Sequence, residues 1–350
     1  MILKYLRQQM LLPIEEYIIN QRVNIKGIDV LLLSFTIEKD KNCLWMIYEN
    51  GKYFRDESDC EDREELRTNR EEMLNNIETS NRDKHFHIGE MEIQGNIVNF
   101  GSSSSSSIYN MNSEGIMRLQ HFIEQGLISK EWDDIELENL IIMECKQMED
   151  EVAPNIDKNQ EMSVVLHIDS STIEIPIQRS FKVEFGKQDI GTKIVYYDKE
   201  LSKENYFFIN EIYSYDIYED VQKQFEKIED KETRERMFNN FMDGLERICP
   251  RGKNLAVIKY EIEDNTQLCF YMKDYLEAKP ISYNDESSIG GASSIGIIYK
   301  SDEEIGINGY KLRECVLQPI DKDFNDELEI ELFSRYLKIP DEQVRGLECK

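Results

Sequence analysis

Two segments of the chain share one pattern of apolar residues, and this pattern constrains the fold more than any other feature. Residues 27–47 read GIDVLLLSFTIEKDKNCLWMI, and residues 252–272 read GKNLAVIKYEIEDNTQLCFYM. In each segment alternate residues of the first run are apolar, which is the period of a strand with one buried face. A polar stretch then leads into a second apolar run. Each segment therefore predicts a β-hairpin, and the shared pattern indicates a module that is used twice.

A helical pattern precedes both segments. Apolar residues recur at helical spacing between residues 2 and 20, and again between Phe238 and Ile248, where Pro250 and Gly252 end the helix. Further helices and antiparallel strands follow in blocks, without sustained βαβ alternation. The sequence therefore predicts an α+β fold with two domains, each containing a helix followed by an antiparallel β-hairpin packed in a largely antiparallel sheet, with a possible internal duplication.

The length of 350 residues favours two domains over a single core. The best candidate for a linker is the polar stretch at residues 149–161. We therefore expect an N-terminal α+β domain over residues 1–151 and a C-terminal α+β domain with a β meander over residues 160–350. A boundary near Asp230 would instead place the meander in the first domain.

The stretch after Gly101 is predicted to be a loop followed by a helix. Six consecutive serines, Ser102–Ser107, lack apolar bulk and compete for their own backbone, so we expect a mobile surface loop. The run has no G-x-S-x-G motif and no base at a fixed spacing, so we expect no nucleophile there. The helix has Ile116, Leu119 and Phe122 on its apolar face and is predicted to end at Gly126.

Charge limits the classes of partner. The chain carries 70 Asp and Glu residues against 42 Lys and Arg residues, a net charge of −28. Such a surface repels nucleic-acid phosphates and anionic lipids, so we expect no direct binding to nucleic acid or membrane. It would attract a basic protein partner, although an acidic surface can also serve solubility alone. The seven cysteines are odd in number and form no C-x-x-C pair, which predicts reduced thiols in the cytoplasm.

Aromatic residues crowd the segment from Tyr206 to Tyr218 and lie beside acidic residues. Tyrosine buries a large area at low entropic cost, so it is common in the hot spots of protein interfaces. The alternative is that these aromatic residues face the core and the seam between domains. The predicted interaction residues are Tyr213, Tyr215, Asp216, Tyr218, Glu219 and Asp220.

A metal site is the alternative to an interaction surface. His85 and His87 are two residues apart on a predicted strand, with Asp83 in the same register, so their side chains would share one face. Imidazoles with a carboxylate suit a transition metal such as zinc. The simpler interpretation is a surface strand that carries two histidines by chance. His167 and Asp169 also share a face, but Asp169 begins a turn, where Asp is common.

Three residues resemble the order of an acid–acid–lysine nuclease site. Asp264, Glu277 and Lys279 approximate the required order of two carboxylates and a lysine. However, Asp264 falls in a predicted turn and Pro280 directly follows the lysine. The Gly-containing loop at residues 287–296 lacks the spacing and the lysine of a phosphate-binding loop.

The sequence therefore favours a non-enzymatic acidic module that binds or neutralises a basic protein partner, in the manner of an immunity protein or an inhibitor. A helix followed by a hairpin in an acidic chain is similar to some small toxin-immunity proteins, although no motif identifies a family. The rival hypothesis is a metal-dependent hydrolase or nuclease that uses acidic residues. We expect no cofactor, and the sequence does not predict the oligomeric state.

Overall fold

The computed structural model describes residues 13–50, 68–82, 86–107, 113–264, 266–280 and 305–348. The chain divides into two compact units. Unit 1 contains residues 1–57, 79–172 and 338–350, and unit 2 contains residues 58–78 and 173–337. The units are thus interleaved along the chain, whereas the sequence predicts two consecutive domains over 1–151 and 160–350.

The prediction of a balanced α+β fold was wrong, because strands make up 51% of the structure and helices only 20%. The first matched segment does form a hairpin of β2 (Ile28–Ile37) and β3 (Asn42–Glu49), but a strand, β1 (Glu15–Ile25), precedes it where residues 15–20 were expected to be helical. Residues 2–12 of that predicted helix lie outside the described residues. In the second segment, β11 (Lys253–Glu261) and β12 (Leu268–Met272) lie in different sheets. The duplication was therefore wrong as well. Apolar alternation fixes which face of a strand is buried, but it leaves the pairing partner open.

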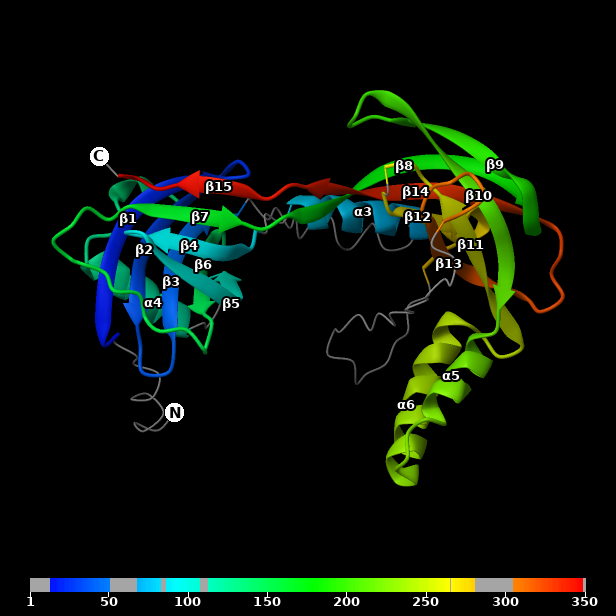
Figure 1. The fold of residues 1–350 in the computed structure, drawn as a ribbon, viewed down its shortest axis with the longest axis horizontal. Helices are drawn as coiled ribbons and strands as arrows, with labels where there is room; N and C mark the ends of the chain where they lie inside the picture. The colour runs from blue at the N-terminus through cyan, green and yellow to red at the C-terminus, as the bar shows by residue number, and fades with distance from the viewer. Residues whose placement is uncertain are drawn as a thin grey trace. The chain divides into compact units, whose positions relative to one another are not determined.

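Unit 1 is a nearly closed antiparallel barrel (Figure 1). Its nine strands follow the order β15-β7-β4-β5-β6-β3-β2-β1-β16. β15 and β16 are consecutive in the chain but stand at opposite ends of this order, so together they bridge the seam between β7 and β1. The remaining strands are β4 (Ile88–Ile93), β5 (Asn96–Ser107), β6 (Leu140–Gln147), β7 (Val164–Ile168), β15 (Glu342–Arg345) and β16 (Leu347–Glu348). The inside of the barrel is filled by apolar side chains, among them Leu32, Met46, Met91 and Leu166.

The serine run is a strand and not the predicted loop. Ser102–Ser107 form the second half of β5 and pair residue by residue with β6, from Ser102 opposite Lys146 to Ser107 opposite Ile141. The ladder pairs the serine backbone groups that face β6, and these groups are then no longer open to hydrogen bonds from the serine hydroxyls. Nothing in the serine side chains themselves signals this pairing.

Unit 2 contains two sheets that share one core. Strands β13, β11, β10 and β9 form the first sheet in that order, and β12, β14 and β8 form the second. Phe207 of the first sheet and Phe270 of the second meet in this core, with ring centroids 5.2 Å apart. Besides β11 and β12, the strands of these two sheets are β8 (Ser171–Glu184), β9 (Gly186–Asp198), β10 (Lys203–Tyr215), β13 (Leu312–Asp321) and β14 (Glu327–Ile339).

The helices of the described chain pack against these sheets or connect their strands. In unit 2, α5 (Ile217–Phe225) and α6 (Lys231–Ile248) pack on each other and on one end of the first sheet (Figure 1). α6 confirms the helix predicted before Pro250. The other helices are α3 (Asn69–Arg82), α4 (Ser113–Glu124), α7 (Lys273–Glu277) and the 3-10 turn η2 (Lys130–Trp132). Among the described residues, none of the helices combines the length and the apolar composition that a membrane crossing requires.

Candidate functional site

A covering layer, made of α4 and residues 126–139, lies on the outer face of the barrel of unit 1. Leu119 and Phe122 of α4 and Leu127 of the following segment pack in one apolar cluster with Trp45 of β3. Gly126, with φ of 72°, ends the helix and turns the chain back over the sheet. The helix predicted to end at this glycine is thereby confirmed, and β2, β3 and β6 are buried on both faces.

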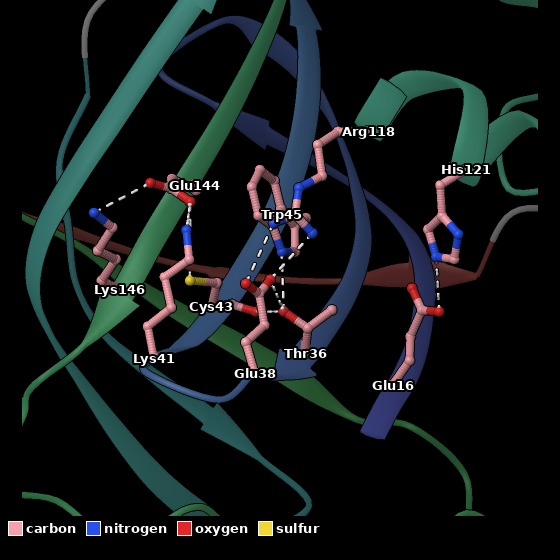
Figure 2. A network of polar contacts seen from close by, with 10 residues as sticks. All are labelled: Glu16, Thr36, Glu38, Lys41, Cys43, Trp45, Arg118, His121, Glu144 and Lys146. Carbon is pink, nitrogen blue, oxygen red and sulfur yellow. Dashed lines mark hydrogen bonds and ion pairs between the residues drawn. The ribbon is translucent and has the colours of Figure 1, made fainter. Parts of the chain in front are cut away.

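A buried ion pair anchors α4 to the barrel. Arg118 extends from the helix toward Glu38, which directly follows β2 (Figure 2), and the guanidinium lies 3.2 Å from the carboxylate. Their side chains are only 9% and 2% exposed. The guanidinium also lies over the ring of Trp45, 4.7 Å from its centroid. A charge pair with this little water around it holds its geometry strongly, because separating it would leave a buried charge unpaired.

Further hydrogen bonds connect this anchor to the neighbouring strands of the barrel. Trp45 Nε1 donates to Thr36 Oγ1 at 3.0 Å, and Thr36 Oγ1 donates to Glu38 Oε1 at 3.2 Å. At a second point on α4, His121 Nε2 lies 3.0 Å from Glu16 Oε2 on β1. The inner side of α4 is therefore tied to three successive strands, β1, β2 and β3, in addition to its apolar packing (Figure 2).

A second group of charges lies beside this anchor. Lys41 Nζ donates to Glu144 Oε2 at 2.6 Å, and Lys146 Nζ lies 3.3 Å from Glu144 Oε1. Burial alone would raise the pKa of Glu144, but the hydrogen bond and charge of Lys41, with the charge of Lys146, outweigh it and lower this pKa. Burial raises the pKa of the neighbouring Cys43 thiol to about 12. A thiol with a pKa raised this far stays protonated near neutral pH and is a poor nucleophile.

The outer side of α4 presents apolar side chains to solvent. Ile116 and Ile123, one heptad apart, are 46% and 53% exposed, and Leu137 in the following segment is 51% exposed. Ile116 was predicted to belong to the apolar face that packs inward. It points outward because Gly115, Arg118, Leu119 and Phe122 occupy the buried side.

Carboxylates are concentrated in the segment that follows α4 in the covering layer. Five of the eight residues from Glu131 to Glu138 are acidic, and all five are exposed. Glu131 forms an ion pair with Arg22, and Glu136 accepts a hydrogen bond from Asn139. Three further carboxylates have no ion pair or hydrogen-bond partner within the described part of the chain: those of Asp133, Asp134 and Glu138.

The predicted tyrosines are half-buried and engaged within unit 2. The Tyr218 hydroxyl donates to the carbonyl of Cys249, and the Tyr213 hydroxyl donates to Glu314 Oε1 at 3.4 Å. Tyr215 and Tyr218 also pack against the apolar cluster below α5 and α6. These contacts match the alternative interpretation of the aromatic segment, in which its side chains pack within the fold. The role of these tyrosines in an interface stays a prediction.

The predicted acidic interaction residues stabilise helix α5. Asp216 is its N-cap, since the carboxylate accepts from the backbone N–H groups of Tyr218 and Glu219, and it also pairs with Lys322 at 3.0 Å. Glu219 pairs with Lys223 one turn along the helix at 2.5 Å. Asp220 Oδ2 accepts from Gln224 Nε2 at 2.7 Å. The three acidic residues next to the tyrosines therefore cap helix α5 or pair with side chains within it.

The candidate metal ligands are only partly described. Asp83 and His85 lie outside the described residues. His87 Nδ1 lies 2.7 Å from Asp169 Oδ2, and His167 pairs with Glu90 at 3.3 Å. Over the described ranges, no group of three or more His, Cys, Asp or Glu side chains is placed to hold a metal ion.

The acid–acid–lysine residues are engaged locally. Asp264 Oδ1 accepts from the backbone N–H of Thr266 at 3.1 Å, as an Asp in a turn does. Glu277 lies 4.0 Å from Lys273 within α7.

The sequence analysis does not predict the covering layer, although the sequence contains one acidic and apolar segment that belongs to it. The segment EWDDIELE, residues 131–138, combines five carboxylates with Trp132, Ile135 and Leu137. Its position over the barrel depends on contacts with residues far away in the chain. Comparisons of the chain with protein-family models, with curated proteins and with solved structures give no match.

Proposed function

We propose that the protein binds a basic protein partner and that the covering layer of unit 1 is the docking surface. The observation that carries this proposal is that one layer combines the exposed apolar side chains of Ile116, Ile123 and Leu137 with three carboxylates that have no partner among the described residues. An apolar centre with a charged rim is the usual composition of a protein interface. A complementary partner would place apolar side chains over α4 and Lys or Arg side chains over residues 131–138.

Two physical steps describe the association. The acidic surface first attracts a basic partner: unit 1 contains 28 Asp and Glu residues against 17 Lys and Arg residues, and the whole chain carries −28. Burial of the apolar side chains then stabilises the docked complex. Because Arg118 and Glu38 fix α4 before docking, little conformational entropy is lost at this step.

The same proposal includes the biological setting. Binding without chemistry suits a protein that neutralises its partner, as an immunity protein or an inhibitor does. We place this activity in the cytoplasm. All five cysteines in the described part of the chain are free thiols, as that compartment favours: Cys43, Cys145, Cys249, Cys269 and Cys315.

The test is capture from native lysate by the full chain at low and high salt, with identification of the eluted proteins. Three baits are compared: the wild type, I116Q/I123Q and Met237→Gln. Glutamine keeps a good helix former on α4 and adds no charge. Met237 is a matched control, because it is an exposed apolar residue on helix α6 of unit 2. We expect a basic protein to be retained at low salt by the wild type and the control, and to be lost by I116Q/I123Q.

A second set of baits tests the charges. Asp133→Asn, Asp134→Asn and Glu138→Gln together remove three negative charges from the layer. Glu229→Gln, Glu232→Gln and Asp323→Asn remove three exposed charges from unit 2 as the control. We expect only the first triple variant to lower retention markedly. Equal retention by both triple variants would mean that the attraction depends only on the net charge of the protein. That result would contradict the assignment of the docking surface to the covering layer.

A further inference from the structure

The outer face of β9 and β10 in unit 2 carries a second cluster, exposed at Val195 and Tyr197 and half-buried at its other members, which we call the aromatic face. It is formed by Val195 and Tyr197 of β9, Tyr206 and Phe208 of β10, and Tyr310. Val195 and Tyr197 are 44% and 56% exposed. Phe207, which lies between Tyr206 and Phe208, points into the core, so strand alternation sends its two neighbours outward.

The rings of the aromatic face hold one another in place. Tyr206 and Phe208 meet edge to face, with centroids 5.5 Å apart, and Phe208 stacks on Tyr310 at 6.2 Å with an interplanar angle of 15°. The Tyr206 hydroxyl donates to Glu263 Oε2 at 3.0 Å. β10 pairs with β9 at both Tyr206 and Phe208, and it also pairs with β11 from Phe208 onward, so the backbone beneath the rings is held by these ladders.

A cation of the chain itself already uses this face. Lys193 stands opposite Phe208 on β9, and its Nζ lies 4.0 Å from the centroid of Tyr206 and 6.0 Å from that of Phe208. A cation at this distance from a ring is attracted by the negative potential of the π face. Lys193 thus marks the place where an incoming cation would find the same attraction.

Charge around the face favours a cationic ligand. Unit 2 contains 42 Asp and Glu residues against 25 Lys and Arg residues. Close to the rings, Glu204 is exposed opposite Tyr197, and Glu263 is exposed beside Tyr206. A guanidinium is planar and weakly hydrated, so it stacks on aromatic rings more readily than an ammonium does.

We propose that the aromatic face binds an arginine side chain of a basic peptide, which displaces Lys193 from the ring of Tyr206. The guanidinium stacks on Tyr206 and Phe208, and Glu204 and Glu263 attract its charge. This surface lies in unit 2 and its test uses a defined peptide. It can therefore fail without affecting the proposal for the covering layer, and the converse also holds.

The test is calorimetric titration of the full chain with a short peptide that alternates arginine with glycine and serine. The same peptide with citrulline in place of arginine keeps the shape of the side chain and removes its charge. The peptide with lysine in place of arginine keeps the charge and lacks the planar guanidinium. We expect affinity to fall in the order arginine, lysine, citrulline. Equal affinity for the arginine and citrulline peptides would overturn the proposal.

Two lysine variants locate the site. Lys193→Ala and Lys199→Ala each remove one positive charge from the β9–β10 hairpin, but only the first uncovers the ring of Tyr206. Relative to Lys199→Ala, we expect Lys193→Ala to bind the arginine peptide about twofold to fivefold more tightly. Tyr206→Leu should weaken binding while circular dichroism shows an unchanged fold. Equal affinities for the two lysine variants, or an unchanged affinity for folded Tyr206→Leu, would contradict the site.

Discussion

The covering layer of unit 1 and the aromatic face of unit 2 both expose apolar groups in acidic surroundings, but they are held in place by different means. The layer includes a helix whose inner side is tied to the barrel by side chains, chiefly Arg118 and Glu38. The aromatic face belongs to a sheet and is held by backbone pairing on both sides of β10. A surface held by side chains depends on single residues, whereas one held by a backbone ladder tolerates their replacement. The two surfaces should therefore differ in sensitivity to substitution.

The largest effect is expected for Arg118→Ala. Removing one partner of a buried ion pair leaves the Glu38 carboxylate without its charge partner, and we expect a loss of about 3–5 kcal/mol of unfolding free energy. Both tryptophans of the chain, Trp45 and Trp132, lie in unit 1, so tryptophan fluorescence in a urea titration follows this unit.

The control for this variant is Lys223→Ala in unit 2, where the pair with Glu219 is exposed. We expect no measurable change in stability by far-UV circular dichroism, because exposed pairs contribute little. If the urea unfolding midpoint of Arg118→Ala equalled that of the wild type, the position of helix α4 would not depend on the buried ion pair.

Two glycines allow the units to be disturbed separately. A Cβ at Gly346, between β15 and β16, would collide with the buried amide of Gln21, and one at Gly306 would collide with the buried carboxylate of Glu261. We expect Gly346→Ala and Gly306→Ala each to lose about 1–3 kcal/mol through overpacking. Tryptophan fluorescence should report the first change and not the second. A shift of the fluorescence midpoint by Gly306→Ala would contradict the separation of the units.

A smaller effect with a defined pH dependence is expected for Glu144→Gln. The pKa of Glu144 is lowered from its ordinary value of 4.5, so its ionised form stabilises the fold. This contribution, about 1–2 kcal/mol for hydrogen bonds to a charged group, is complete above pH 4.5 and is lost as the pH falls through the lowered folded pKa. The gap between wild type and variant in urea titrations should close in that acidic range. A gap that is constant with pH would contradict the assignment.

The smallest effect on stability is expected for Ile123→Gln. The side chain is exposed on the outer side of α4, so we expect the unfolding free energy to change by less than about 0.5 kcal/mol. The fluorescence midpoint in urea measures this change. A large loss of stability would mean that Ile123 packs against the unit and would remove it from the proposed docking surface.

The hairpin of β2 and β3 could be predicted from its apolar runs and its polar turn, and it formed as expected. The single apolar face through Leu33, Phe35 and Ile37 did not form, because a β-bulge between Leu32 and Ser34 places Leu33 in the outer cluster and Phe35 in the cluster inside the barrel. The partners of β11 and β12 could not be predicted, because their pairing with β10, β13 and β14 depends on segments distant in the chain. The serine strand gave no signal, since its order comes from the backbone ladder to β6.

The candidate site was less predictable than the strands. Arg118 and Glu38 are 80 residues apart, and neither lies in a motif that connects them. The acidic segment from Glu131 to Glu138 was visible in the sequence, but its place beside α4 follows from the packing of Leu127 and Trp132 on the barrel. Conversely, the acids near Tyr215 were conspicuous in the sequence and are used for capping and ion pairs within unit 2. The acidic composition led to the hypothesis of a binding protein, and the position of the proposed docking surface could be inferred only from the fold.

The most direct test is a calorimetric titration of the full chain with the purified basic partner from the capture experiment, at low and at high salt. We predict that I116Q/I123Q weakens the affinity by about tenfold or more at low salt, that Met237→Gln leaves it unchanged, and that high salt weakens all three complexes. Equal affinities of the wild type and I116Q/I123Q, or an affinity that does not depend on salt, would contradict the account.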